Sequence, residues 1–118
     1  KQVNDRHGHH VGDAILQRFA AVSREQLRRT DLIARYGGEE FIMLLPEGTP
    51  DDISDVLERL RQTFAGLNHD DLVPGLSVTL SGGLASWRPG DDADTLTRRA
   101  DEALYRAKHH GRNRIEMA

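Results

Sequence analysis

Two short apolar runs flanking a Gly-Gly-Glu-Glu segment restrict the fold of this chain more than any other feature. Residues 32–36 and 41–45 have the length and side chains of β-strands, and Gly37 and Gly38 lie between them. Glycine accepts the backbone angles of a tight turn, so the pattern predicts a β-hairpin. The carboxylates of Glu39 and Glu40 would then lie at the tip of this hairpin.

Three helices are predicted from apolar residues at helical spacing. The first spans about residues 11–29, the second begins near Asp51 and Asp52, and the third ends near Gly111. Acidic residues at the start of the second helix and Lys108 near the end of the third suit the helix dipole. The apolar positions are Val11, Ile15, Phe19 and Val22; Ile53, Val56, Leu57, Leu60 and Phe64; and Leu96, Ala100, Ala103, Leu104 and Ala107.

Two further strands complete the expected elements. Residues 76–81 alternate apolar and polar side chains, which is typical of a half-buried strand, and Gly82 and Gly83 would kink or bulge it. Ile115 suits a short final strand. Helices interleaved with mainly antiparallel strands in 118 residues indicate one α/β domain. We expect a palm-like sandwich, in which helices flank a single central sheet.

Composition argues against several classes of function. The net charge is −3, and only 5% of the residues are aromatic, which does not favour a nucleic acid polymer as partner. The absence of Cys removes disulfides, thiolate metal sites and thiol nucleophiles. No apolar run approaches the roughly 20 residues of a membrane-spanning helix, so we expect no membrane insertion of this segment.

By itself, Gly37-Gly38-Glu39-Glu40 is a weak functional signal, because a glycine turn followed by two solvated carboxylates is common. The functional interpretation is that the glycines let a phosphate group approach the backbone closely. The adjacent acids could bind Mg²⁺, which prefers oxygen ligands and could polarise a phosphoryl group. The surrounding sequence decides between the two interpretations.

Three motifs, in the same order along the chain, resemble those of the GGDEF family of bacterial diguanylate cyclases. Residues 35–41, Arg-Tyr-Gly-Gly-Glu-Glu-Phe, match the family's hairpin signature. Residues 1–13 are similar to its stretch through Asn-Asp, Gly-His and Gly-Asp, and residues 99–113 to its closing helix and loop. The resemblance implies the GGDEF fold, which is related to the nucleotidyl cyclase fold. It also implies condensation of two GTP into cyclic di-GMP, with release of two pyrophosphates.

The resemblance gives roles to the acidic and amide residues of these motifs. Asn4 and Asp13 match the positions that recognise guanine. Without the resemblance they would be a turn Asn and an acid near a helix N-terminus. Glu39 matches the family's metal-binding acid and Glu40 the neighbouring acid of the catalytic turn. Both are expected to bind Mg²⁺ or Mn²⁺ and to serve phosphoryl transfer.

Other residues would hold the phosphates of GTP. Lys108 and Arg112 match the family's basic pair for the terminal phosphates. Alone, they would be cations that favour a helix C-terminus. Gly37 and Gly38 would let the phosphates approach the turn.

A possible inhibitory site precedes the hairpin. Arg28 and Asp31 match the family's Arg-x-x-Asp motif, where the product cyclic di-GMP binds and arrests the enzyme. The other interpretation of this short motif is an ion pair at a helix end. Arg59 is a candidate for a second inhibitory contact.

His7, His9 and His10 could suggest a zinc site. The resemblance places His9 in the family's Gly-His loop and the other two at positions that are expected to vary. We therefore expect no zinc site here.

The start of the sequence matches a point inside the family's pattern. The family's first strand ends in Asp-x-Asp-x-Phe-Lys, and Lys1 matches this Lys. The resemblance thus implies that the first strand, with an Asp that binds the catalytic metal, precedes residues 1–118 in a longer protein. Residues 1–118 alone, the GGDEF domain without its N-terminal portion, are expected to be catalytically impaired.

The resemblance also implies partners. Catalysis is expected to need a homodimer, in which each 3′-hydroxyl attacks the α-phosphate of the other GTP. An attached sensor or regulatory domain is expected, and the longer protein could be attached to a membrane. GTP as substrate indicates a cytoplasmic location for this domain.

Two other functions stay open. One is a domain without turnover that senses cyclic di-GMP through Arg28 and Asp31, or GTP through the active site. The intact Gly-Gly-Glu-Glu-Phe sequence weighs against it. The other is a scaffold domain that only dimerises, which would leave the matching guanine and phosphate positions unexplained.

Overall fold

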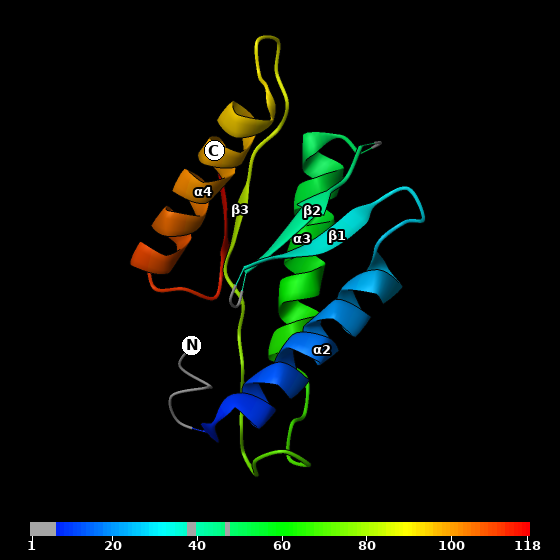
Figure 1. The fold of residues 1–118 in the computed structure, drawn as a ribbon, viewed down its shortest axis with the longest axis vertical. Coiled ribbons are helices and arrows are strands. Elements are labelled where there is room, and N and C mark those ends of the chain that lie inside the picture. The colour runs from blue at the N-terminus through cyan, green and yellow to red at the C-terminus, as the bar shows by residue number, and fades with distance from the viewer. Residues whose placement is uncertain (1–6, 38–39, 47) are drawn as a thin grey trace. The chain divides into compact units, whose positions relative to one another are not determined.

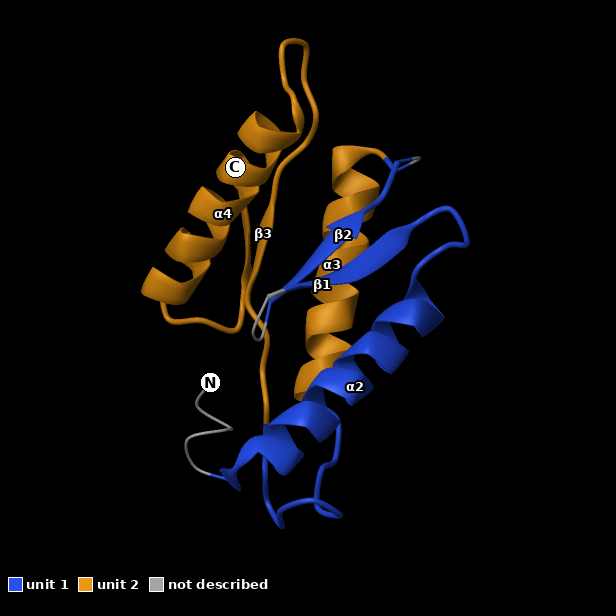
Figure 2. Cartoon of the chain, in the orientation of Figure 1, with its two compact units in different colours: residues 1–48, 66–77 blue, residues 49–65, 78–118 orange. Residues whose placement is uncertain are grey.

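The computed structural model describes residues 7–37, 40–46 and 48–118 of this protein (Figure 1). Its elements are α2 (His9–Gln26), β1 (Leu32–Gly37), β2 (Glu40–Leu44), α3 (Pro50–Ala65), β3 (Gly82–Leu84), α4 (Ala93–His109) and β4 (Ile115–Met117). They form two compact units, coloured separately in Figure 2. The hairpin unit comprises Lys1–Gly48 and Gly66–Ser77, and the α4 unit comprises Thr49–Ala65 and Val78–Ala118.

The hairpin unit contains the predicted first helix and the predicted hairpin. β1 and β2 pair in antiparallel register, with Arg35 opposite Phe41 and a register shift between Arg35 and Gly37. The Phe41 ring lies against Phe19 of α2, with ring centroids 4.8 Å apart. Ile15, on the same helix, is buried. The hairpin prediction is confirmed.

α2 ends three residues earlier than the predicted residue 29, at Gln26. The next residue, Leu27, has an extended backbone with φ −87° and ψ 154°. A turn follows, in which the amide of Asp31 donates to the carbonyl of Arg28 at 3.0 Å. The Asp31 carboxylate in turn accepts from the Arg28 amide at 2.8 Å. Side-chain to backbone bonds of this kind compete with helix continuation and end α2 here.

The α4 unit contains the other two predicted helices. The Thr49 hydroxyl accepts from the Asp52 amide at 3.2 Å and so caps the start of α3. Asp92 and Thr95 form a capping box at the start of α4, each side chain accepting the other's amide. The core of this unit includes Leu60 and Phe64 of α3, Leu84 of β3, and Ala103 and Ala107 of α4.

β3 lies very close to α4. A Cβ atom added to Gly83 would lie 2.2 Å from the Ala100 carbonyl oxygen and 2.3 Å from the Leu104 amide nitrogen. The missing side chain of Gly83 thus lets the strand backbone contact the helix backbone. Gly82 and Gly83 were predicted to kink a strand, but they form the paired strand itself.

Two expectations about the strands were wrong. Residues 76–81 alternate between half-buried and exposed up to Leu80, yet they form no ladder, and pairing begins only at Gly82. In addition, β3 pairs with β4 in parallel, and within the described residues the strands form two separate two-stranded ladders rather than one sheet. Alternation reports which side of an extended segment is covered, whereas a ladder also needs a neighbouring backbone as partner. The α/β class and the antiparallel hairpin are as predicted.

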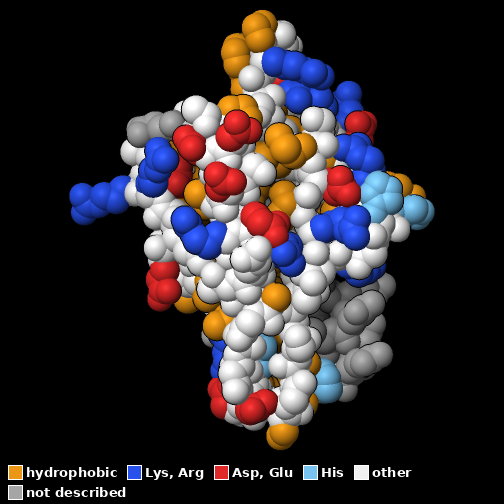
Figure 3. Space-filling view, turned by 180° about the vertical axis from the view of Figure 1, so that it is seen from behind, with side chains coloured by type: hydrophobic (Ala, Val, Ile, Leu, Met, Phe, Trp, Pro, Cys, Tyr) orange, Lys and Arg blue, Asp and Glu red, His pale blue; other side chains and the backbone are white. Residues whose placement is uncertain are grey.

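Within the described ranges, no helix has both the length and the apolar character needed to cross a bilayer. The molecular face in Figure 3 carries acidic and basic side chains together rather than a basic stripe, in keeping with the net charge of −3.

Candidate functional site

The glycine turn of the hairpin is described only at its two ends. Gly37 closes β1 and Glu40 opens β2, and the two residues are register partners. The Glu40 side chain is exposed. Gly38 and Glu39 lie outside the described residues, as does Asn4. The predicted roles of these three residues therefore stay predictions.

A pocket of about 350 Å³ lies in the hairpin unit, between α2 and the hairpin strands. Its lining residues are Asp13, Leu16, Gln17 and Ala20 of α2, Arg35 of β1 and Phe41 of β2. The pocket therefore combines a carboxylate, an amide and a guanidinium with apolar surface. A flat ring with polar edges, such as a nucleobase, fits this chemistry, because apolar walls cover its faces and polar groups bind its edge.

The structure thus brings one predicted guanine-binding residue, Asp13, next to two residues of the signature hairpin, Arg35 and Phe41. Prediction from sequence did not identify Gln17 or Arg35 as pocket residues. A signal for part of this set was present, because positions 13, 16, 17 and 20 follow the i, i+3, i+4, i+7 spacing of one helix face. This face neighbours the apolar stripe through Ile15 and Phe19 on the same helix.

The two basic residues predicted to bind phosphate lie at the end of α4, in the other unit. Lys108 is exposed on the last turn of the helix. Gly111 follows the helix with φ 114°, and the Arg112 amide donates to the Ala107 carbonyl at 2.9 Å. This glycine and backbone bond correspond to a Schellman cap, which explains why the helix ends two residues before Gly111.

Of the predicted inhibitory residues, Arg28 and Arg59 are exposed and Asp31 is half-buried. In the turn between α2 and β1, the Asp31 carboxylate binds the backbone amide of Arg28, and no ion pair joins their side chains. The Arg28 side chain is exposed, and within the described ranges it forms no hydrogen bond or ion pair. Arg59 is exposed on α3 of the α4 unit. The ion-pair interpretation of Arg28 and Asp31 is therefore wrong.

The described part of the chain contains no group of three His, Cys, Asp or Glu side chains arranged to hold a metal ion. His9 and His10 lie in the first turn of α2, and both are exposed. The exposed Glu40 carboxylate is a hard oxygen donor, which is the ligand type that Mg²⁺ and Mn²⁺ prefer. Glu40 therefore fits such a metal by its chemistry, as one ligand of a larger set.

Comparison with known proteins identifies a family. The family model described as "Diguanylate cyclase, GGDEF domain" matches residues 1–114. The diguanylate cyclase DgcP of Pseudomonas aeruginosa is 42% identical over 118 residues, covering 100% of this chain and 18% of that protein. The response regulator PleD of Caulobacter vibrioides is 38% identical over 120 residues, covering 98% of this chain and 26% of that protein. This chain thus spans only 18% and 26% of the length of these two curated relatives.

Solved structures agree. The coiled coil and GGDEF domain of DgcB from Caulobacter crescentus, in complex with c-di-GMP, has a TM-score of 0.91 at 31% identity, covering 99% of this chain and 63% of that chain. The diguanylate cyclase SiaD of Pseudomonas aeruginosa, in complex with its activator SiaC, has a TM-score of 0.91 at 41% identity, covering 99% and 45%. The predicted family and fold class are confirmed.

Proposed function

Because this chain belongs to the GGDEF family of diguanylate cyclases, we propose that its full-length protein condenses two GTP into cyclic di-GMP and releases two pyrophosphates. The observation that carries this proposal is the pocket in the hairpin unit. It joins Asp13, at the guanine-binding position of the sequence pattern, to Arg35 and Phe41 of the signature hairpin. This combination supports a base-binding role for the pocket, because two of its lining residues belong to the signature hairpin.

Asp13 and Asn4 are proposed to select guanine. A carboxylate accepts from the ring N–H and exocyclic amino group of guanine, and an adenine edge lacks this pair of donors. The apolar walls of the pocket, Leu16, Ala20 and Phe41, suit the ring faces. Discrimination would thus follow from the hydrogen bonds at the edge rather than from the shape of the walls.

Phosphate handling is proposed for the turn and for the end of α4. Gly37 and Gly38 let phosphate oxygens approach the backbone, while Lys108 and Arg112 bind the terminal phosphates by charge-assisted hydrogen bonds. Glu39 and Glu40 would hold Mg²⁺ or Mn²⁺. When bound, such an ion neutralises charge on phosphoryl oxygens and promotes deprotonation of a hydroxyl.

A homodimer is proposed as the active species, because cyclic di-GMP contains two nucleotides and each domain would bind one GTP. Product inhibition is proposed at Arg28 and Asp31, with Arg59 as a second contact. The guanidinium of Arg28 supports this role, because it is exposed and forms no hydrogen bond or ion pair in the part of the chain that the structure describes. A cytoplasmic location follows from GTP as the substrate.

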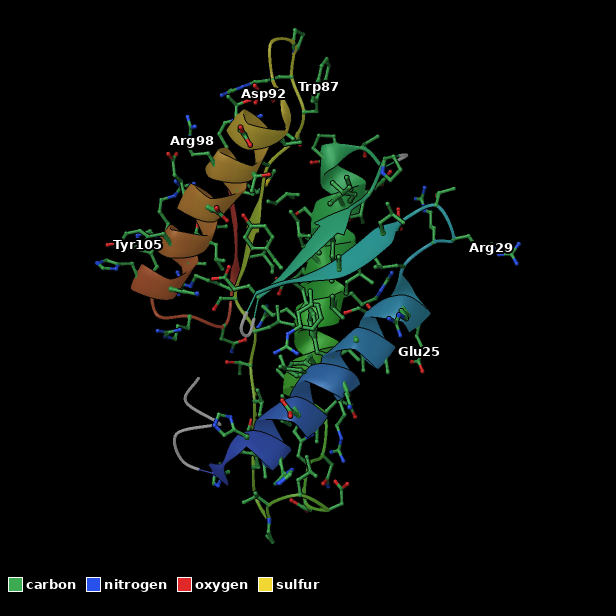
Figure 4. The ribbon with its side chains drawn as sticks, in the orientation of Figure 1. Glu25, Arg29, Trp87, Asp92, Arg98 and Tyr105 are labelled. Atoms are coloured by element: carbon green, nitrogen blue, oxygen red, sulfur yellow. The ribbon has the colours of Figure 1, made fainter. Side chains whose placement is uncertain are left out.

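The test is conversion of GTP to cyclic di-GMP by the full-length protein with Mg²⁺, beside Glu39→Ala and Glu40→Ala variants. Glu25→Ala is a matched control, because Glu25 is an exposed carboxylate near the end of α2 (Figure 4). We expect product from the wild type and from Glu25→Ala, and at least about 100-fold less from each of the other two variants.

Other outcomes lead to different conclusions. A wild type without product that still binds cyclic di-GMP, and loses this binding on Arg28→Ala, would be a sensor rather than a cyclase. If the wild type binds neither GTP nor cyclic di-GMP, the scaffold domain is the remaining interpretation.

A further inference from the structure

The loop after α4 has an unusual backbone. Gly111, Arg112 and Asn113 have φ angles of 114°, 62° and 49°, all in the positive region. Glycine adopts such angles readily, but Arg and Asn adopt them at a conformational cost. Two successive non-glycine residues in this region require surrounding contacts that hold them there.

Those contacts come from two other segments of the α4 unit. Arg61 of α3 donates from Nη1 to the Asn113 side-chain oxygen Oδ1 at 2.8 Å. The Asn113 amide donates to the hydroxyl oxygen of Ser81, just before β3, at 3.1 Å. Asn113 is therefore fixed through both its side chain and its backbone.

Arg61 is itself held in one orientation. Its Nε lies 3.0 and 3.1 Å from the two carboxylate oxygens of Glu58, one turn earlier on α3, and its Nη2 donates to the same carboxylate. This hydrogen bonding lowers the pKa of Glu58, so the carboxylate stays ionised. A two-pronged contact of this kind fixes the plane of the guanidinium. The contact with Glu58 thus orients the guanidinium so that Nη1 faces Asn113.

Arg112 lies between the end of α4 and Asn113, and hydrogen bonds hold the backbone on both sides of it. Its amide is bound to the Ala107 carbonyl at 2.9 Å, and its neighbour Asn113 is bound to Arg61. Its exposed side chain forms no hydrogen bond or ion pair within the described ranges. The backbone of Arg112 is therefore held while its guanidinium is available for a ligand.

We propose that Arg61, acting through Asn113, is a positioning residue that holds this loop so that Arg112 presents its guanidinium to the terminal phosphates of the nucleotide. This inference rests on the proposed function, because it takes the phosphate-binding role of Arg112 from there. It adds a residue on a different helix, 51 positions away from Arg112 in sequence, whose guanidinium binds Asn113 and Glu58.

The test uses the full-length protein and measures dissociation constants for GDP and GMP, which need no turnover, together with KM and kcat for GTP. GDP carries a terminal phosphate that GMP lacks. We expect Arg61→Gln and Arg112→Ala each to weaken GDP binding about tenfold. Both variants should leave GMP binding unchanged. Arg61→Gln should raise KM for GTP more than it lowers kcat. Arg98→Gln, an exposed arginine on α4 (Figure 4), is the matched control and should change none of these values.

The double variant Arg61→Gln, Arg112→Ala decides between positioning and general stability. If Arg61 acts through Arg112, the double variant should bind GDP no more weakly than Arg112→Ala alone. Additive losses, or equal losses for GDP and GMP, would overturn the proposal. So would a wild type that binds GDP no better than GMP.

A second variant covers the case in which Arg61→Gln does not fold. Asn113→Gly accepts the φ of 49° but removes the side-chain oxygen that Arg61 binds at 2.8 Å, and leaves only the long 3.5 Å bond from Arg61 to the backbone carbonyl. It should therefore reproduce the selective loss of GDP affinity. Unchanged GDP affinity in Asn113→Gly would contradict the proposal. The wild type could make no cyclic di-GMP while the Arg61→Gln and Arg112→Ala variants still show non-additive losses of GDP affinity. That outcome would refute the proposed function and leave the positioning role of Arg61 standing.

Discussion

Arg18 donates a hydrogen bond of 2.9 Å from its guanidinium to Nδ1 of His69, whose side chain is completely buried. A guanidinium can only donate, so Nδ1 accepts, and the neutral imidazole carries its proton on Nε2. The same guanidinium pairs with the Asp71 carboxylate, 3.0 Å from Nη1 to Oδ1. This cluster ties α2, which carries the pocket residue Asp13, to the 66–77 stretch of the hairpin unit.

The first prediction concerns pH. Burial first, and then the charge of Arg18, lower the pKa of His69 from its ordinary 6.5. The unfolded chain therefore binds this proton at a higher pH than the folded chain, so the free energy of unfolding should fall as the pH drops below about 6.5. The pKa of Asp71 is also lowered, chiefly by its hydrogen bond from Arg18, but its effect begins only near its ordinary 3.8.

Urea denaturation at a series of pH values between about 7 and 5 measures this effect. His69→Gln keeps an acceptor for Arg18 without a titrating group, and should make the free energy of unfolding less dependent on pH. His10→Gln, at an exposed position on α2, should leave the wild-type dependence intact. Identical pH profiles for the wild type and His69→Gln would contradict the assignment.

The second prediction concerns the contact between β3 and α4. Gly83→Ala should lower the free energy of unfolding by about 3 kcal/mol, because its Cβ meets helix backbone atoms that cannot move aside. Gly82→Ala is the matched control. Its Cβ would meet the flexible end of Ile115 at 2.7 Å, so the loss should be about 1 kcal/mol. Equal losses in urea denaturation would show that β3 is not restricted by the helix backbone.

The third prediction concerns the start of α4. Asp92→Ala removes the side chain that accepts the Thr95 amide at 2.8 Å, and should lower the free energy of unfolding by about 1 kcal/mol. Asp94→Ala, in the same first turn, should lose only about 0.3 kcal/mol of helix-dipole stabilisation. Figure 4 shows Asp92 at this helix end. A larger loss for Asp94→Ala in thermal or urea unfolding would refute the cap.

The fourth prediction concerns product inhibition, and it rests on the proposed function. Arg28→Ala should raise the inhibition constant of cyclic di-GMP at least about tenfold, because one charge-assisted contact to phosphate is lost. Arg29→Ala should not change this constant, although Arg29 is the adjacent exposed arginine and is labelled on the same turn in Figure 4. The measurement is cyclase rate against added cyclic di-GMP. Equal effects of the two variants would assign the inhibition to the general charge of the turn.

Several features of this protein follow from the sequence alone. The hairpin around Gly37, the three helices and their apolar faces, and the family itself were all predicted correctly. These features depend on turn chemistry, on helical periodicity and on motif order. Each is a pattern among residues that are near one another in the sequence. The candidate site was predictable only in part, because Asp13 was named from its motif and lies in the pocket, whereas Gln17 and Arg35 were not named.

Tertiary structure decided the rest. The alternation of residues 76–81 does not show that strand pairing starts only at Gly82. It also does not show that Gly82 pairs in parallel with Ile115. Both depend on which distant backbone segment lies alongside the strand. Likewise, no local pattern links Arg61 to Asn113, 52 positions apart. Sequence periodicity fixes which face of an element is buried. The partner that each face or side chain meets is fixed only when the whole chain packs, since such contacts join residues far apart along the chain.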